Sequence, residues 1–442
     1  MSDQNASQTD QGYKQDEDYD PDFPIRHVPQ EERRSLQSIA VVLLGFTFFS
    51  GTMIAGASLG ASYPFADLLW VLLVGNLLLG IYVAVLSVIA ARTGLTTVLL
   101  ARYTLGDGGS KLASLLLGGT QVGWFGVTVA FMALPFADAL GLPDAALPAL
   151  MVLWGVLHGA TAYFGYRGME KLSLVSVPLL LVVGLVSVAI AIRDAGGMGE
   201  IIAMEPTETM TFATALTVIV GTFASGGTQA PNWARFAKTA KVAFIAAFLA
   251  FFAANALMVL FGAFGGLVYD EPDLAEVLAI QGLALFSVLF LTLNLWTTND
   301  NAAYAFGVAG AEVFNVNRKR VFVVGGSAIG VVLAITGIYD MIMPWLEALG
   351  TYIPPLGGVI IGDFFFVWQG KLPRLEHITF ARIRWSAVLG YALGVLAALL
   401  VPGIPPLNGI IGAIVGMLVF RPLVAKLKGA EHTVHENAEY VG

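Results

Sequence analysis

"TFFSG" at residues 47–51 recurs as "TFASG" at residues 222–226, with one position changed. Both copies lie inside long apolar runs and are followed by helix-weakening residues, namely Gly56, Gly60, Gly227 and Pro231. Close packing of membrane helices would explain the glycines alone. It would not explain why aromatic and hydroxyl side chains recur at matched positions, a pattern typical of inverted repeats. We therefore predict that both segments are broken helices whose breaks form a site.

The composition of the chain is that of a protein embedded in a lipid bilayer. Of the 442 residues, 57% are hydrophobic and 12% are charged, and the mean hydropathy is +0.77. A soluble domain carries about twice that share of charged residues. The chain has no cysteine, and its five histidines lack zinc-like spacing. We expect an all-α integral membrane protein with no disulfide, no zinc site and no cofactor.

Apolar stretches of about 20 residues predict transmembrane helices. We count twelve of them: 37–60, 66–91, 112–137, 147–164, 172–192, 211–228, 241–266, 279–310, 321–338, 341–366, 385–401 and 406–426. With the N-terminus inside, only Arg193 of the 23 Lys and Arg residues falls outside, which leaves 22 on the cytoplasmic side. Changing the count by one span would destroy this agreement with the positive-inside rule. The sequence predicts a multi-pass protein with twelve transmembrane helices and both termini in the cytoplasm.

The repeated pentapeptide divides these spans into units. Its copies lie in the first and the sixth span, so a unit of five spans would enter the membrane from the opposite face. We predict a first inverted repeat at 37–192, a second at 211–366, and two additional spans at 385–426. The flanking residues 1–36 and 427–442 carry a surplus of acidic side chains. We expect both to be cytoplasmic tails, and the acidic segment 1–36 to be disordered.

"LNLWTTNDN" at residues 293–301 places a cluster of polar side chains inside an apolar span. At about 100° per residue, Asn294, Thr297 and Thr298 share one helical face, and Asn301 continues it. An amide and two hydroxyls at this spacing bring three neutral oxygens near one point, where carbonyls of an unwound helix could complete the shell of a sodium ion. Hydrogen bonding between helices is the alternative, at about 0.6–2 kcal/mol per bond.

"GGTQVGWFGV" at residues 118–127 places Gln121 and Trp124 one turn apart on one helical face. A carboxamide beside an indole can hydrogen-bond the edge of a planar ring while the indole stacks on its face. Phe223, in the second pentapeptide, could cover the opposite face. No Lys or Arg lies near these motifs, which argues against an anionic substrate. The pattern favours a flat, polar, uncharged heteroaromatic ring.

Several long motifs resemble the nucleobase:cation symporter-1 family, and in particular its purine–cytosine permease-like members. They are "LLLGGTQVGWFGV", "LNLWTTNDN", "IPPLGGVIIGD", "GNLLLGIY" and "TGLTTVLLARY", and the resemblance covers roughly residues 37–425. It implies a five-plus-five inverted repeat with broken first and sixth helices plus two extra helices. It also implies alternating access and cytosine import by sodium symport, without enzymatic chemistry. We expect a monomer in the bacterial cytoplasmic (inner) membrane that binds no nucleic acid.

The resemblance also assigns roles to individual positions. Trp124 and Phe223 would sandwich the base. Its edge would be bound by Gln121, Ser225, backbone groups around Thr222 and Gly226, and the nearby Asn299. Sodium would be held by side-chain oxygens of Asn294, Thr297 and Thr298 and by the carbonyls of Gly45 and Phe48.

One position departs from the family pattern, and it keeps alternatives open. Similar permeases carry an acid followed by an aromatic residue just after the second broken segment, where this chain has Asn232 and Trp233. The same fold could therefore carry another nucleobase or a hydantoin-like ring (uracil, a purine), or could use protons. A membrane enzyme is less consistent with the sequence, because Asp300 has no evident carboxylate partner in the spans and no HExxH motif is present. Two non-identical broken segments also fit alternating access better than a channel.

Overall fold

The computed structural model describes residues 20–428 and 432–442, and most of them are helical. The longer helices are α2 (Leu36–Thr47), α3 (Gly51–Ser62), α4 (Phe65–Thr93), α5 (Thr97–Ala139), α6 (Leu147–Phe164), α7 (Tyr166–Asp194), α9 (Phe212–Thr228), α11 (Ala240–Phe248), α12 (Asn255–Tyr269), α14 (Ala284–Val313), α15 (Lys319–Ile335), α16 (Ile342–Tyr352), α17 (Pro354–Gly362), α18 (Trp385–Leu400) and α19 (Pro405–Lys428). The shorter ones are α8 (Met198–Ile202), α10 (Pro231–Ala234), α13 (Leu274–Ile280) and the π-helical η3 (Leu249–Ala254) and η5 (Asp363–Val367). Short 3₁₀ turns are η1 (Gln30–Glu32), η2 (Asp144–Ala146), η4 (Ile338–Met341) and η6 (Leu375–His377).

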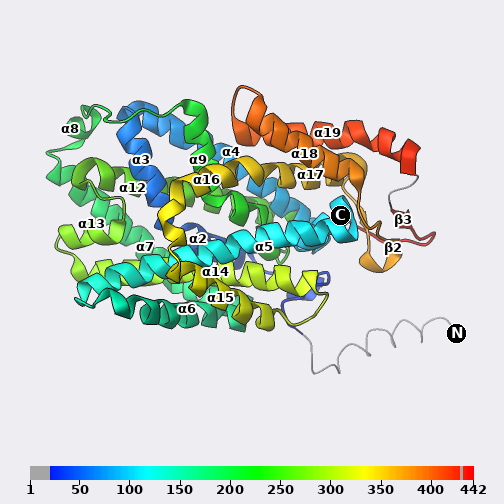
Figure 1. Ribbon diagram of the computed structural model, residues 1–442, viewed down its shortest axis with the longest axis horizontal. Coiled ribbons are helices and arrows are strands. Elements are labelled where there is room, and N and C mark those ends of the chain that lie inside the picture. The colour runs from blue at the N-terminus through cyan, green and yellow to red at the C-terminus, as the bar shows by residue number, and fades with distance from the viewer. Residues whose placement is uncertain (1–19, 429–431) are drawn as a thin grey trace.

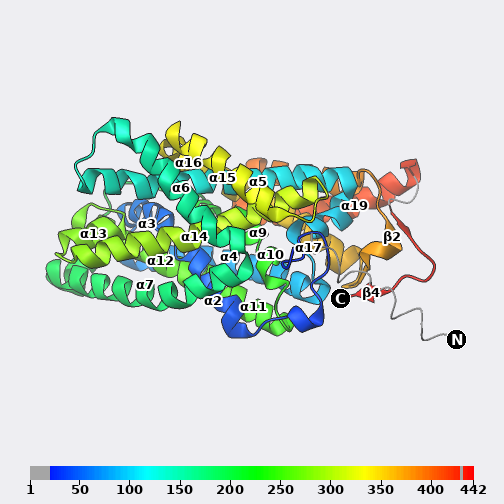
Figure 2. The same cartoon turned by 90° about the horizontal axis from the view of Figure 1, so that it is seen from below.

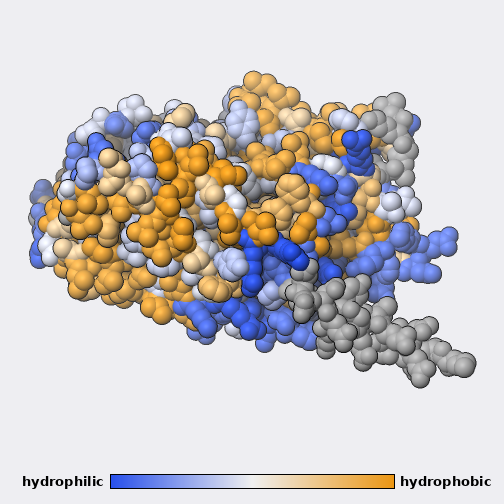
Figure 3. Space-filling view, turned by 60° about the horizontal axis from the view of Figure 1, so that its bottom comes forward, coloured by the Kyte–Doolittle hydropathy of each residue, from blue (hydrophilic) through white to orange (hydrophobic). Residues whose placement is uncertain are grey.

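The long helices run roughly along the longest axis of the molecule (Figure 1, Figure 2). Helical segments occupy each range that the sequence predicts as a span. Seven described helices are long and apolar enough to cross a membrane, or eight if the bent pair α2–α3 counts as one span. Hydrophobic side chains cover much of the face in Figure 3. Leu112, Leu285 and Leu400 are 72%, 70% and 74% exposed, as expected for side chains that face lipid.

Polar caps fix where several helices begin. Ser35, Thr96, Thr211 and Thr239 each accept a hydrogen bond from the backbone N–H three residues further on. Such caps satisfy backbone donors that the first turn of a helix leaves without partners. The caps therefore set the starts of α2, α5, α9 and α11.

The two pentapeptides coincide with breaks in helical geometry. The first separates α2 from α3, whose axes are bent by 61°. Phe48 has φ −73° and ψ 85° there. The second lies in α9, which departs from helical angles at Phe223 (φ −132°, ψ 20°). Phe48 and Phe223 are equivalent positions of the repeat, so both helices are interrupted at the same place, fully in the first copy and at one residue in the second.

The glycines after the first pentapeptide have a different role from the predicted one. Gly56 and Gly60 lie within the continuous helix α3, so the break does not occur at these glycines. A Cβ added to Gly56 would collide with the backbone carbonyl of Val259 in α12, and one on Gly60 would touch Ala263. Small residues here let the backbones of α3 and α12 approach closely.

The described segments nearest the two chain ends contact the helical body. The prediction of a disordered segment 1–36 is wrong for residues 20–36, which contain η1, the buried Asp20 and Asp22, and the start of α2, while residues 1–19 lie outside the described part. Near the C-terminus, β3 (Thr433–Val434) pairs antiparallel with β2 (Ile378–Thr379), and β4 (Tyr440–Val441) pairs with β1 (Leu372–Pro373). These strands lie at one end of the long axis, opposite α8 and α13 (Figure 1).

Candidate functional site

A buried cavity lies where the two breaks meet. It is small, with a volume of about 10 Å³, and it is lined by Phe46, Phe49, Gln121, Trp124, Thr128, Thr222, Phe223, Gly226, Thr298 and Ala302. These residues come from the break between α2 and α3 and from α5, α9 and α14. Segments far apart in sequence thus converge on one space whose lining carries no charged side chain.

Aromatic rings form the apolar walls of the cavity. Trp124 and Phe223, predicted to enclose a ring, both lie in the lining and are 7% and 4% exposed. The ring centroid of Phe49 is 5.5 Å from that of Trp124 and 6.4 Å from that of Phe223, and its plane is nearly perpendicular to both. Aromatic faces of this kind can stack on a flat ligand. The structure adds Phe49 as a ring that contacts both predicted walls.

Hydrogen-bonding groups form the polar side of the cavity. The Gln121 Nε2 donates to the Ser225 hydroxyl at 3.0 Å, and the hydroxyl of Thr120 also hydrogen-bonds Ser225. The Thr222 hydroxyl donates to the Ile219 carbonyl at 2.7 Å. Thr120, Gln121 and Ser225 hold one another, and Thr222 is held by its own helix, so their orientations are set by contacts within the protein.

The predicted ion ligands gather beside the end of α2. The Thr298 hydroxyl lies 3.3 Å from the Phe46 carbonyl oxygen and 3.1 Å from that of Phe48. The Asn294 Oδ1 accepts the Ser50 N–H at 2.8 Å, which fastens α14 to the break. Carbonyls at the end of a helix lack partners within it, so they are available to a hard cation.

Gly45 and Thr297 complete this group. The Thr297 hydroxyl donates to the Leu293 carbonyl at 2.8 Å, which leaves its lone pairs free to accept or to ligate. A Cβ placed on Gly45 would come within 3.5 Å of the Thr297 Cβ. The five predicted donors therefore lie on two neighbouring segments, the end of α2 and the polar face of α14.

Asn299 lies away from the cavity. Its amide nitrogen is 3.0 Å from His158 Nδ1 and donates to the Phe125 carbonyl at 3.4 Å, so its side chain points toward α6 and α5. Neither Asn299 nor Ser225 is among the lining residues, but Ser225 hydrogen-bonds the lining residue Gln121, whereas Asn299 contacts His158 and Phe125. The structure thus brings the other predicted substrate residues together but separates this one from them.

The structure also adds residues that the sequence did not single out. Phe49 was overlooked because it occupies the one position at which the two pentapeptides differ. Asn255 and Asn76 lie behind the cavity: the Asn255 Nδ2 donates to the Asn76 Oδ1 at 2.8 Å and lies 3.1 Å from the Thr222 hydroxyl. Buried asparagines in two apolar helices were the available signal for this contact.

The unusual Asn232 has a partner in the fold. Its Oδ1 accepts the Thr97 N–H at 3.1 Å, in the first turn of α5. An amide oxygen serves there as an acceptor for a helix start. Asn232 therefore has a structural contact, and it is not part of the cavity lining.

A bundle of apolar helices around a buried, uncharged cavity at two helix breaks defines a membrane transport protein. The chain belongs to the family described as permeases for cytosine/purines, uracil, thiamine and allantoin, whose profile matches residues 27–421. Membership places it among permeases rather than enzymes.

Individual relatives agree with this assignment. The cytosine permease of Escherichia coli (strain K12) is 40% identical over 417 residues, which are 94% of this chain and 97% of that protein. The hydantoin permease of Microbacterium maritypicum is 23% identical over 376 residues, 76% of this chain and 75% of that protein. Among solved structures, the chain is similar to Mhp1, a nucleobase-cation-symport-1 family transporter, in a closed conformation with bromovinylhydantoin bound. The TM-score is 0.81 at 20% sequence identity, and the match covers 92% of this chain and 96% of the Mhp1 chain. That likeness shows a shared fold.

Proposed function

We propose that this chain is a secondary active transporter that imports cytosine by sodium symport through alternating access. The observation that carries the proposal is the cavity itself, where Gln121, Trp124 and Phe223 meet between two helix breaks. The 40% identity to a cytosine permease over 94% of the chain supports the choice of base. Gln121 and Ser225 offer an amide and a hydroxyl to the ring edge, and Trp124 and Phe223 offer faces to stack on.

We further propose the topology that alternating access requires. The spans would form inverted repeats at 37–192 and 211–366, followed by the additional pair at 385–426. Their total of twelve would place both termini in the cytoplasm of a bacterial cell, with the monomer as the transporting unit. The equivalent interruptions at Phe48 and Phe223 support the repeat.

Uptake into proteoliposomes tests the function directly. Radiolabelled cytosine is offered with an inward sodium gradient, with an equal potassium gradient, and with a proton gradient. We expect saturable uptake only with sodium. Equal uptake under sodium and potassium would refute the coupling, and the absence of saturable uptake would refute cytosine as substrate.

The choice of ring has one rival, because the hydantoin permease is also similar to this chain. Unlabelled uracil, adenine and a hydantoin compete against labelled cytosine in the same assay. An uncharged lining would suit flat rings of several kinds, so the hydrogen-bonding groups of Gln121 and Ser225 would decide among them. A compound that halves labelled uptake at a lower concentration than unlabelled cytosine does would be the better substrate.

Thr298→Ala should weaken sodium activation. Its hydroxyl is the side-chain oxygen in contact with the carbonyls of Phe46 and Phe48, and losing one such polar interaction costs about 1 kcal/mol. The sodium concentration for half-maximal uptake should therefore rise about fivefold. Thr336→Ala is the matched control, because that hydroxyl is exposed and bonds only a carbonyl three residues back. An unchanged sodium requirement in Thr298→Ala would place the ion elsewhere.

A further inference from the structure

Ser173, in α7, is a buried hydroxyl without a partner. Its side chain is 0% exposed, and its Oγ forms no hydrogen bond with any residue of the described part. A buried serine in a helix usually donates to the carbonyl four residues back, as Ser176 does to Leu172 at 2.9 Å. Leaving a buried hydroxyl unsatisfied costs about 1–3 kcal/mol. A bound ligand that contacts the Ser173 hydroxyl would remove this cost.

The Ser173 hydroxyl faces the end of α2. A Cβ placed on Gly45 would collide with the Ser173 Oγ and would touch the Thr297 Cβ. Gly45, Ser173 and Thr297 are therefore packed against one another. The Gly45 carbonyl accepts no backbone hydrogen bond in the described chain, because α2 ends before the N–H that would reach it. An unpartnered hydroxyl in α7 and an unpartnered carbonyl in α2 thus belong to neighbouring residues, and Thr297 of α14 lies beside them.

We propose that Ser173 is a further ligand of the coupling cation, in addition to the oxygens of α2 and α14. The inference rests on the proposed sodium symport and extends its site to a third helix. Neutral hydroxyl and carbonyl oxygens are the donors that suit a hard monovalent cation. With this ligand, the ion would join α7 to the first helix break and to α14, so that sodium binding would fix the relative positions of all three.

Ser173→Ala tests the inference, with Ser176→Ala as the control on the same helix. We expect the sodium concentration for half-maximal cytosine uptake to rise at least fivefold in Ser173→Ala and to stay unchanged in Ser176→Ala. At saturating sodium, the KM for cytosine should match that of the unaltered protein. The second readout is the melting temperature of the purified protein in sodium chloride against choline chloride, where Ser173→Ala should lose most of the sodium-dependent rise.

The outcomes separate this inference from the function it rests on. If the unaltered protein needs sodium and Ser173→Ala keeps the same sodium requirement and stabilisation, Ser173 is not a ligand. If the unaltered protein transports cytosine equally well with and without sodium, both the sodium symport and the role of Ser173 as a sodium ligand are refuted.

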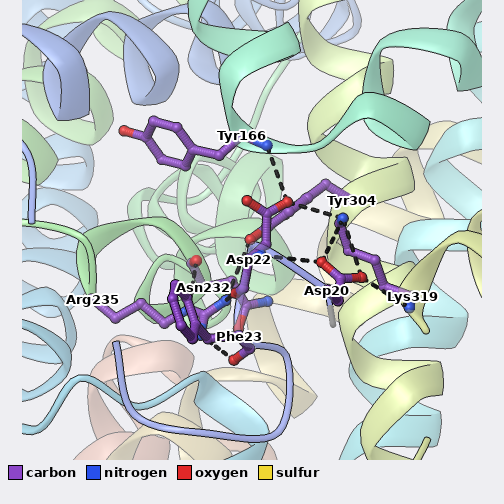
Figure 4. A network of polar contacts seen from close by, with 8 residues as sticks. All are labelled: Asp20, Asp22, Phe23, Tyr166, Asn232, Arg235, Tyr304 and Lys319. Carbon is purple, nitrogen blue, oxygen red and sulfur yellow. Dashed lines mark hydrogen bonds and ion pairs between the residues drawn. The ribbon is translucent and has the colours of Figure 1, made fainter. Parts of the chain in front are cut away.

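An independent set of contacts concerns the strap, residues 20–34, of which Asp20, Asp22 and Phe23 are drawn with their partners in Figure 4. Lys319, at the start of α15, is 1% exposed. Its Nζ lies 3.1 Å from the Asp20 Oδ1 and 2.9 Å from the Asp22 Oδ2. Both carboxylates are buried as well, so the ion pairs are shielded from water. Removing one partner of such a pair leaves an uncompensated buried charge.

Arg235, just after α10, holds the strap from the other side. This fully buried side chain donates to the Asp22 carbonyl at 2.5 Å and to the Phe23 carbonyl at 2.7 Å. The Asp22 carboxylate also accepts the Tyr166 N–H at 3.2 Å, at the start of α7. The strap therefore ties together the starts of α7 and α15 and the segment that follows α9.

His27 and Val28 attach the strap to the turn between α4 and α5. The Val28 N–H donates to the Gly94 carbonyl at 3.0 Å. The His27 Nδ1 lies 2.7 Å from the Thr93 carbonyl oxygen and so carries the hydrogen. Burial lowers the pKa of His27, although the Thr93 carbonyl opposes the shift, and this favours the neutral ring.

A row of rings connects the cavity to the strap. Phe46, in the cavity wall, lies 5.0 Å from Trp233 between ring centroids, and Trp233 lies 6.1 Å from Tyr304. The Tyr304 hydroxyl is 3.3 Å from an Arg235 nitrogen, and the Lys319 Nζ is 5.9 Å from the Tyr304 ring. The groups that bind the strap are thus linked to the cavity wall through Tyr304 and Trp233.

We infer that the strap is the inner closure of the transporter and must leave its ion pairs before the cavity opens to the cytoplasm. The double variant Asp20→Asn, Asp22→Asn tests this in a chain that naturally lacks cysteine. Ala302→Cys, in the cavity lining, adds a single reporter thiol, and inside-out vesicles receive a membrane-impermeant maleimide. We expect labelling at least fivefold faster with the double variant than without it.

The control is Glu31→Gln, Glu32→Gln, which removes two carboxylates from the exposed part of the strap. This pair should leave the labelling rate unchanged. Elution as a single monodisperse peak shows that each variant is folded before rates are compared. Equal rates for the two double variants would overturn the inference. Disruption of the fold by Asp20→Asn, Asp22→Asn alone would also overturn it, because the strap would then be a structural brace.

Discussion

Trp124→Ala should weaken cytosine binding about 5- to 150-fold. The indole is a buried wall of the cavity, and loss of base–aromatic stacking costs about 1–3 kcal/mol per base. Trp124→Phe keeps an aromatic face and should recover much of the loss. The measurement is the Kd for cytosine by calorimetry on purified protein in saturating sodium.

Trp70→Ala is the control for that experiment. Trp70 is also an indole in a long helix, α4, but it is 65% exposed on the outside of the bundle. It should bind cytosine as the unaltered protein does. Equal Kd values for Trp124→Ala and Trp70→Ala would show that the base binds outside the cavity.

Arg384→Met should cause the largest loss of stability, about 3–5 kcal/mol. Arg384 and Asp363 are 2% and 1% exposed at the side-chain level, and their closest N–O distance is 2.8 Å. Arg384 also donates to the Tyr103 carbonyl at 2.6 Å, so it joins α18 to α5 and to η5. Removing the guanidinium leaves the Asp363 carboxylate buried. The apparent melting temperature in detergent should fall sharply.

Two further variants show whether the stranded charge is the cause. Asp363→Asn together with Arg384→Met removes both charges and should regain most of the melting temperature. Arg193→Met breaks an exposed pair with Asp194 and should cost at most about 1 kcal/mol, since water already solvates both groups. A double variant as unstable as Arg384→Met alone would show that packing, rather than charge, dominates at this position.

The sequence predicted the helices well because the bilayer leaves few options for an apolar stretch. Backbone groups in lipid must bond within the segment, so length and hydropathy are enough to place a span such as 147–164, which matches α6 at both ends. The pentapeptide repeat was also informative, because it predicted that the two helices are interrupted at equivalent positions. Phe48 and Phe223 leave helical geometry at the same position of the repeat.

Other features depended on contacts that no local pattern contains. Gly56 resembled a helix breaker but proved to be a contact with α12, because only the packed pair shows which carbonyl approaches it. By composition the strap resembles a disordered acidic tail. In the structure Asp20 and Asp22 form ion pairs with Lys319, some 300 residues away in sequence. Asn299 lies on the same helix as the predicted ligands, but its amide nitrogen is 3.0 Å from His158 Nδ1. The sequence does not show this contact, which orients the side chain toward α6.

The sequence by itself determined which segments are helical, where two of them are interrupted, and which residue types are available at the interruptions. Those properties follow from hydropathy, backbone hydrogen bonding and side-chain chemistry, which act over a few residues. The tertiary structure decided which of these side chains share the cavity, which oxygens face the end of α2, and that the strap is buried. Such choices depend on the mutual orientation of helices distant in sequence, and close packing fixes that orientation only once the whole bundle has formed.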